Sequence, residues 1–240
     1  TIELKLTKTK KTYQKFSTLK AKNTNLIFLE KSFKEKVRGV ILEGSSRSGK
    51  TYSSIFFIIW ICSIHDKAIT INIVKETYNS FKTTLYDDFS KILDMFGLDN
   101  PFERSKEIAT FRIWNHKINF LGADMPSKFH GASADFYWFN EPLEIPRAIF
   151  DQAEMRCRVF WWMDLNPSVT EHWIFSNVEP RPDVKFFHST YKDNPHISKS
   201  ERQKILSYEP TPENIQHGTA DDFMWKVYGL GLRAAPEGLI

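Results

Sequence analysis

The chain has 240 residues, which is enough for one substantial α/β core with a small appendage. With 41% hydrophobic and 26% charged residues, its composition is that of an ordinary globular protein and excludes a disordered or fibrous chain. The net charge of +4 is weak grounds for a nucleic-acid partner. The two cysteines, Cys62 and Cys157, lie far apart in apolar surroundings and suggest neither a disulfide framework nor a metal site.

The N-terminal segment is strongly basic, with seven lysines and one glutamate in residues 1–22. Such a segment is either a solvated arm or an element that covers a nucleotide base or contacts DNA phosphates. We take residues 1–36 as this N-terminal unit. The chain begins at Thr1 without a signal-peptide pattern, so we expect a domain of a longer protein that is not secreted.

From residue 37 onward, strand and helix patterns alternate. Apolar or β-branched runs predict buried strands, and apolar residues at helical spacing predict helices. The run at 55–64 is very apolar, but about ten residues cannot span a bilayer that needs roughly 20, so it indicates a buried helix and no membrane segment. Strands are predicted at residues 37–43, 68–74, 136–139, 159–165 and 184–188, a two-strand ribbon at 108–114 and 117–121, and helices from 50 and at 78–96, 145–156 and 199–208.

The segment GSSRSGKT follows the first strand and opens the first of these helices. It matches the phosphate-loop pattern GxxxxGK[ST], in which backbone N–H groups and a helix N-terminus surround phosphate. Lys50 is expected to contact the β- and γ-phosphates of ATP, and Thr51 to ligate Mg²⁺. Arg47 is either a solvent-facing residue or a catalytic cation near the γ-phosphate. The predicted binding residues are Gly44, Ser45, Ser46, Arg47, Ser48, Gly49, Lys50 and Thr51.

A second acidic element is needed for hydrolysis, and residues 135–141 supply an apolar strand that ends in Asn-Glu. Glu141 is the predicted catalytic base that polarises the attacking water. Asn140 stands where an aspartate beside Mg²⁺ is usual. We expect its amide oxygen to hold a metal-bound water, or Asn140 to stand behind another carboxylate such as Asp164.

These patterns predict an α/β fold of the P-loop NTPase type. Alternating strands and helices, with strands apolar on both faces, favour a mainly parallel central sheet flanked by helices, as in RecA-like ATPases. The core is expected at residues 37–208. Residues 209–240, which begin with a proline-containing stretch and end rich in glycine, are expected to form a small lid-like segment or linker.

Further segments suggest a family. Residues 129–135 (FHGASAD) precede the acidic strand, residues 164–167 (DLNP) end the next one, residues 189–195 (STYKDNP) follow the last core strand, and a glycine-rich run closes the chain. Together with GSSRSGKT, this order resembles the ATPase domain of tailed-bacteriophage terminase large subunits, from about residue 37 to the end.

The resemblance implies roles for particular residues. Lys50 and Thr51 would bind phosphate and Mg²⁺, and Glu141 would be the catalytic carboxylate. Asn166 would report the state of the γ-phosphate, although Asp164 or Ser168 could take that part. An N-terminal glutamine or aromatic residue holds adenine in such proteins, which makes Gln14 and Tyr13 the candidates here.

The resemblance also implies partners and a place of action. The expected function is ATP hydrolysis that drives double-stranded DNA into a procapsid, together with a portal protein and a small terminase subunit. A homo-oligomeric ring is expected on the portal, with a monomer possible in isolation, in the cytoplasm of the host cell. A nuclease domain would follow the glycine-rich run, so cleavage is not expected here. The alternatives are a helicase-like ATPase and a nucleotide-binding scaffold protein.

Overall fold

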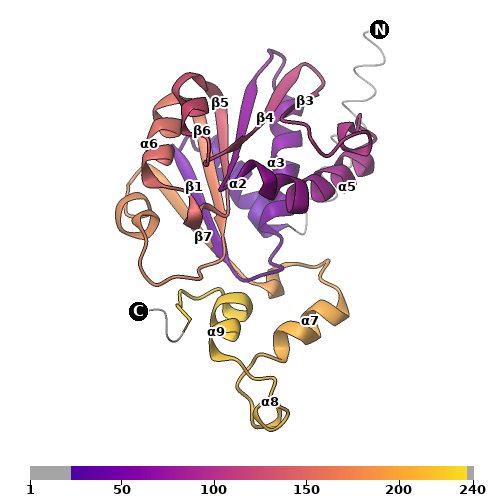
Figure 1. Cartoon of the computed structure of the whole chain (residues 1–240), viewed down its shortest axis with the longest axis vertical. Coiled ribbons are helices and arrows are strands. Elements are labelled where there is room, and N and C mark those ends of the chain that lie inside the picture. Colours follow the sequence, from indigo (N-terminus) through magenta and orange to yellow (C-terminus); the bar gives the residue numbers. More distant parts are fainter. Residues whose placement is uncertain (1–22, 237–240) are drawn as a thin grey trace.

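The computed structural model describes residues 23–236. Its centre is a seven-stranded sheet in the order β3-β4-β2-β5-β6-β1-β7 (Figure 1). All neighbouring strands are parallel except β3 and β4, which form the predicted antiparallel ribbon. The strands are β1 (Gly39–Gly44), β2 (Thr70–Lys75), β3 (Thr110–Ile113), β4 (His116–Gly122), β5 (Ala134–Asn140), β6 (Cys157–Leu165) and β7 (Val184–Ser189).

Helices flank both faces of this sheet, which confirms the predicted fold class (Figure 1). The α-helices are α2 (Thr24–Lys34), α3 (Lys50–Ile64), α4 (Tyr78–Ser80), α5 (Tyr86–Phe96), α6 (Arg147–Arg156), α7 (Lys199–Leu206), α8 (Pro212–Gln216) and α9 (Asp222–Met224). Single π-helical turns occur at η1 (Phe81–Leu85), η5 (Ile174–Val178) and η7 (Trp225–Leu230), and 3₁₀ turns at η2 (Pro101–Glu103), η3 (Pro126–Gly131), η4 (Pro142–Glu144) and η6 (Tyr191–Asp193).

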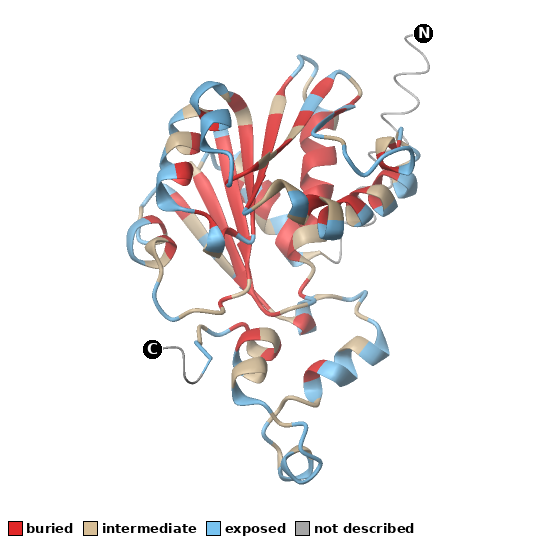
Figure 2. Cartoon of the chain, viewed as in Figure 1, coloured by how far each residue is buried: buried red, intermediate tan, exposed pale blue. Residues whose placement is uncertain are grey.

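The central strands are buried on both faces because successive side chains enter two separate cores. In β5, Phe136 and Trp138 pack with α3 and α5, whereas Tyr137 and Phe139 pack with α6. This is the period-two alternation of a pleated strand between two helical layers. Figure 2 shows the central strands and α3 as the most buried part of the chain.

Helix α2 was not predicted, because the lysine-rich residues before it suggested an extended arm. It begins at the N-cap Asn23, whose side chain accepts a hydrogen bond from the N–H of Leu26. Leu26 and Leu29 are fully buried and pack in the core that contains α3. Residue 36 is therefore no structural boundary, since α2 is part of the same folded body as the sheet.

Two other predicted elements differ in detail. The helix expected at 145–156 begins at Arg147, because Pro146 precedes it in an extended conformation. The helix expected at 78–96 is continuous in position but passes through a π-helical turn, η1, between α4 and α5. The remaining predicted strands and helices are confirmed to within a few residues.

The C-terminal segment, residues 199–236, lies beyond the ends of β1 and β7 and includes α7, which the sequence placed in the core at residues 37–208 (Figure 1). Helices α7 and α8 are mostly exposed (Figure 2). The segment returns to the core after η7: Gly231 approaches the backbone of Ser45 so closely that an added Cβ would lie 2.6 Å from its nitrogen. Arg233 pairs with Glu43, at 2.9 Å, and with Glu179.

The sheet order brings three strand ends together. β6 lies between β1 and β5, with Glu43 opposite Leu165 and Asn140 opposite Asp164. The loop that leaves β1 and the residues that end β5 and β6 therefore share one edge of the sheet. None of the described helices is long and apolar enough to cross a membrane.

Candidate nucleotide-binding site

The loop between β1 and α3 has a conformation that requires its glycines. A Cβ on Gly44 would lie 1.8 Å from the carbonyl oxygen of Ser189 on β7, so only glycine fits there. Gly49, with φ of 85°, is left-handed where the chain turns into α3. Arg47 is left-handed as well, with φ of 61°, which is uncommon for a residue with a side chain.

Hydrogen bonds from neighbouring segments hold this loop from outside. Asn25 of α2 donates to the Ser48 carbonyl at 3.0 Å and accepts from the Ser189 hydroxyl at 2.9 Å. The Tyr191 N–H donates to the Ser45 hydroxyl at 2.7 Å. Asn194 donates to the Arg47 carbonyl at 2.8 Å. Hydrogen bonds within the protein therefore hold the loop in shape, as a phosphate-binding loop requires.

Lys50 is buried at the centre of the loop. Four oxygen atoms lie within 3.1 Å of its Nζ: the carbonyls of Gly44 and Ser45, the Ser48 hydroxyl and the Asn166 amide oxygen. Burial lowers the pKa of Lys50 to about 8, against the opposing effect of Asp164 and other nearby carboxylates. The structure thus places Asn166, at the end of β6, in direct contact with the loop lysine.

Thr51 faces a buried carboxylate. Its hydroxyl donates to Oδ2 of Asp164 at 2.9 Å, and Asp164 is 2% exposed. The indole of Trp138 donates to Oδ1 of Asp164 at 2.6 Å, and the amide of Asn140 donates to both oxygens at 3.1 and 3.2 Å. Burial raises the pKa of Asp164, while these donors oppose that rise.

Asn140 lies behind Asp164, which is the second of the two arrangements expected from the sequence and not the one in which its oxygen holds a metal-bound water. The amide oxygen of Asn140 accepts from Nζ of Lys75 at 2.8 Å. A lysine ammonium can only donate, so the Asn140 oxygen must face Lys75 and its nitrogen must face Asp164. Asn140 therefore offers no oxygen to a cation at Thr51.

Glu141 directly follows β5 in a left-handed conformation, with φ of 53°, and its N–H donates to the Asp164 carbonyl at 2.9 Å. Its carboxylate forms an ion pair with Lys75, which ends β2 and is buried. The Glu141 side chain is 60% exposed and faces the cavity beside the loop. A positive φ at a non-glycine residue is strained, and such strain is common at functional sites.

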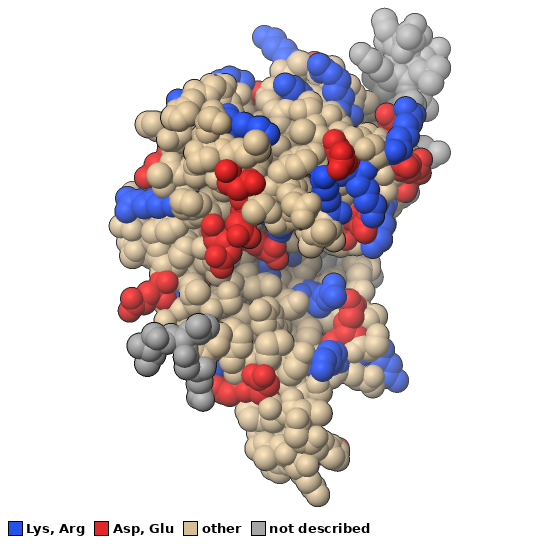
Figure 3. All heavy atoms as spheres, in the orientation of Figure 1, with Lys and Arg blue, Asp and Glu red and all other residues tan. Residues whose placement is uncertain are grey.

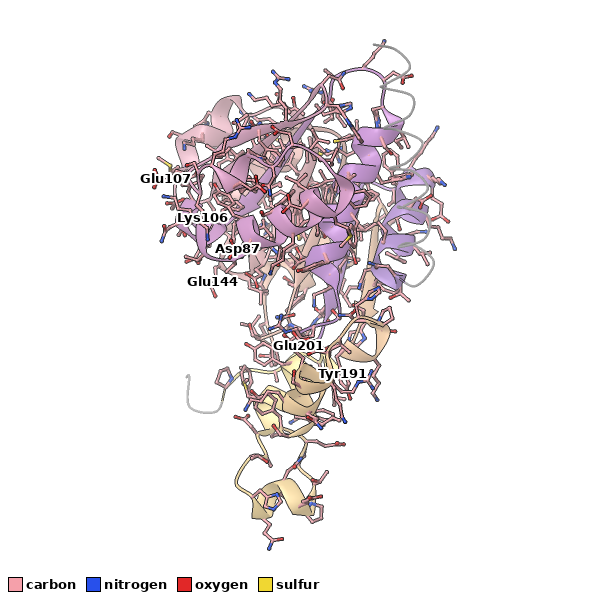
Figure 4. All side chains as sticks on the ribbon, turned by 90° about the vertical axis from the view of Figure 1, so that its right-hand side faces the viewer. Asp87, Lys106, Glu107, Glu144, Tyr191 and Glu201 are labelled. Carbon is pink, nitrogen blue, oxygen red and sulfur yellow. The ribbon has the colours of Figure 1, made fainter. Side chains whose placement is uncertain are left out.

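One cavity of about 620 Å³ joins these groups. Arg47 also lines it, and Nε of Arg47 pairs with Glu201 of α7 at 3.2 Å. Glu201 is held in place because its other oxygen accepts from Ser198 in a capping box. Glu201 and Tyr191 lie where the C-terminal segment joins the core (Figure 4). The cavity is lined by residues of the loop, α3, β5, β6, α5 and α7, among them Lys50, Thr51, Glu141, Asp164, Asn166, Asp88 and Asn194.

A family model for the phage terminase large subunit matches residues 36–231, which is most of the chain. The chain belongs to this family. None of the curated proteins is significantly similar to it in sequence.

Solved structures of large terminases share the fold of this family member. The large terminase of a thermophilic bacteriophage aligns with a TM-score of 0.64 and 18% identity over 82% of this chain and 49% of that one. The complex of the same phage enzyme with ADP aligns with a TM-score of 0.60 and 19% identity, over 75% and 47% of the two chains. The HK97 bacteriophage large terminase aligns with a TM-score of 0.52 and 13% identity, over 82% and 47%. The chain spans about half the length of these terminases.

Several residues of this terminase site were not recognised in the sequence. Asn25 sits in the unpredicted helix α2, and Lys75 is the last residue of a strand whose position in the sheet is not readable from local sequence. Tyr13 and Gln14, the candidates for adenine contact, lie outside the described residues. Within residues 23–236, no group of three or more His, Cys, Asp or Glu side chains is arranged to hold a metal ion.

Proposed function

We propose that this chain binds ATP at the GSSRSGKT loop and hydrolyses it, and that hydrolysis drives the translocation of double-stranded DNA during phage genome packaging. The observation that carries the proposal is one cavity lined by Lys50, Thr51 and Glu141. Lys50 and Thr51 open α3, which follows β1, whereas Glu141 follows β5, and β6 separates β1 from β5 in the sheet. These three side chains are the cation, the hydroxyl and the carboxylate that phosphoryl transfer to water uses.

Each group has a physical role in this reaction. The N–H groups of the loop and the N-terminus of α3 favour the negative charge of the phosphates. Lys50 offsets charge on the β- and γ-phosphates, and Arg47 could approach the γ-phosphate only by leaving Glu201. Glu141 would orient and polarise the attacking water. Asn166 contacts Lys50 and would respond when the γ-phosphate is lost.

A magnesium ion fits the oxygen groups present. Mg²⁺ prefers hydroxyl, carboxylate and water oxygens, and the Thr51 hydroxyl lies 2.9 Å from a buried carboxylate oxygen. When bound with ATP, the ion would neutralise charge that develops on the phosphates. Thr51 is the residue of the loop that would ligate it.

The partners follow from the family and not from a surface feature. Membership in the large-subunit family supports action on double-stranded DNA with a portal protein and a small terminase subunit, as a ring, in the host cytoplasm during assembly. On the face shown in Figure 3, basic and acidic side chains are intermixed. That face gives no continuous basic track by which a DNA path could be drawn.

The test is ATP turnover by the purified chain, with and without DNA and portal protein. Lys50→Ala should lower turnover by about 100-fold or more and weaken ATP binding, because the other cation of the loop, Arg47, is paired with Glu201. Lys67→Ala, which removes an exposed lysine away from the cavity, is the matched control. Turnover of Lys50→Ala within about threefold of the unsubstituted chain would show that the loop is not the catalytic site.

The second arm of this test separates binding from chemistry. Glu141→Gln should bind ATP with nearly unchanged affinity but hydrolyse it very slowly, because an amide accepts a proton poorly. Normal turnover by this variant would place the base elsewhere.

A further inference from the structure

The two oxygens of Asp164 have different surroundings. Oδ1 accepts from the Trp138 indole at 2.6 Å and from the Asn140 amide at 3.1 Å, both of which are buried core groups. Oδ2 accepts from the Thr51 hydroxyl at 2.9 Å and from the same Asn140 amide at 3.2 Å. Oδ1 thus faces only buried core groups, whereas Oδ2 also faces Thr51 in the first turn of α3.

The neighbouring position on β5 cannot do the same. Asn140 lies opposite Asp164 in the register of β5 and β6, so the two side chains occupy equivalent places at adjacent strand ends. Nζ of Lys75 donates to the Asn140 amide oxygen at 2.8 Å, so this oxygen is not directed at the site. What Asn140 presents to the site is an N–H donor, which attracts a carboxylate and repels a cation.

Resting on the proposed function, we propose that Asp164 on β6, and not the usual acidic residue of β5, supplies the negative charge beside the Mg²⁺ that accompanies the nucleotide. Asn140 is a positioning residue: its amide holds the carboxylate with Oδ2 toward Thr51. Lys75 fixes the orientation of that amide. The charge that P-loop enzymes ordinarily carry at the end of one strand is here carried by the strand next to it.

A purely structural role for Asp164 is the competing explanation. The carboxylate would then serve only as acceptor for Trp138, Asn140 and Thr51. Taking a carboxylate out of water is costly, and a neutral side chain with the same acceptor oxygen would satisfy the indole at lower cost. A cation bound on the Thr51 side would offset the cost of burying the charged carboxylate. The two explanations therefore predict different effects of Asp164 substitutions on metal binding.

The experiment measures Mn²⁺, used in place of Mg²⁺, by electron paramagnetic resonance as it binds to the 240-residue chain saturated with ADP. ADP affinity is measured separately in chelator. Asp164→Asn keeps the size of the side chain and an acceptor oxygen for Trp138 while removing the charge. Asp135→Asn is the control, because it removes an acid from the far end of β5, where Asp135 pairs with Arg158.

We expect Asp164→Asn to raise the Mn²⁺ dissociation constant at least about tenfold, with ADP affinity in chelator nearly unchanged. Asp135→Asn should leave both unchanged. Asp164→Glu keeps the charge but moves it by one methylene, so it should cause a smaller loss and provides a second variant should the first fold poorly. Asn140→Leu should also weaken Mn²⁺ binding, since the carboxylate then loses its positioning donor.

Two results would overturn the proposal. The first is unchanged Mn²⁺ affinity in both Asp164 variants. The second is a loss of ADP affinity in Asp164→Asn that is equal with and without metal, which would mean that Asp164 acts through the fold. If ADP fails to bind even the unsubstituted chain, the proposed function itself is wrong and this inference falls with it.

Discussion

Lys50 combines burial with a charge that the site needs. Its ammonium is surrounded by four loop and strand oxygens, yet desolvation lowers its pKa to about 8. A polyphosphate beside the ammonium favours the charged form and raises that pKa again. Nucleotide binding should therefore be coupled to the protonation of one identifiable side chain.

At pH 8.5 to 9, we expect ADP binding to take up a fraction of a proton, because Lys50 is partly neutral before binding and charged afterwards. ADP affinity should therefore fall as pH rises above about 8, because more of the free protein then has a neutral Lys50. Proton uptake should vanish near pH 6.5, where Lys50 is already charged before ADP binds. Calorimetry in buffers of different ionisation enthalpy measures this uptake. Lys50→Arg is the control, since arginine stays charged; equal uptake by that variant would assign the proton to another group.

At the scale of single residues, the sequence predicted what is local in the chain. Lys50 and Thr51 follow from the spacing of one loop, and Glu141 from its place after an apolar strand. The partnership of Asp164 with Thr51 is different, because it depends on β6 lying between β1 and β5. Strand order is a property of the folded sheet, and so the sequence named Asp164 only as the alternative to Asn140 and did not predict its contact with Thr51.

Among the elements, the C-terminal return after η7 is tied to the strand that leads into the phosphate loop. Arg233 pairs with the buried Glu43 at 2.9 Å and also with Glu179, and its guanidinium lies 3.7 Å from the centre of the Phe175 ring. Burial raises the pKa of Glu43, and Arg233 opposes that rise. Glu43 directly precedes Gly44, so this ion pair joins the C-terminal segment to the start of the loop.

Arg233→Met should lower the free energy of unfolding by about 1–3 kcal/mol at pH 7.5, because it leaves Glu43 without its cation. Without Arg233, the pKa of Glu43 should rise further. An acid with a raised folded-state pKa costs stability as pH increases through that range, so the deficit should shrink toward pH 5. Urea denaturation at both pH values measures it. Arg104→Met, at an exposed pair with Asp99, is the control, and a pH-independent deficit would contradict the argument.

Helix α2 shows why some elements escaped prediction. Its apolar residues Leu26 and Leu29 stand at helical spacing, but seven lysines immediately before it gave the whole segment the composition of an arm. The strands of the core were easier, because a strand buried on both faces is apolar throughout. Secondary structure was readable where burial is nearly complete and less so where one face of a helix is solvated.

On the scale of the whole molecule, the cavity lies between the sheet edge and the C-terminal segment. Arg47 of the loop contacts Glu201 of α7, and Gly231 lies against Gly44 and Ser45 of the loop. Two parts of the C-terminal segment, α7 and the residues after η7, are thus in direct contact with the loop. Under the proposed function, a nucleotide-dependent change in the loop would reach the C-terminal segment through these two contacts.

DNA binding by the chain should depend on salt and not on sequence. Lysine and arginine contacts to phosphates release counterions, so log affinity should fall linearly with log salt, with a slope of about 0.9 per contact. Fluorescence anisotropy with two duplexes of unrelated sequence, at several salt concentrations, measures both properties. A flat salt response, or strong preference for one duplex, would point to contacts other than those to the phosphate backbone.

The register that sets Asn140 opposite Asp164 has an evolutionary consequence. Two positions that face each other at adjacent strand ends can exchange an acid for an amide without moving the charge by more than a few ångströms. Substitutions at the two positions should then be compensated: relatives with an acid at the end of β5 should tolerate a neutral residue at the position of Asp164, and the reverse. If Asp164 supplies the charge as proposed, a search that requires the acid on one particular strand would overlook chains of this kind.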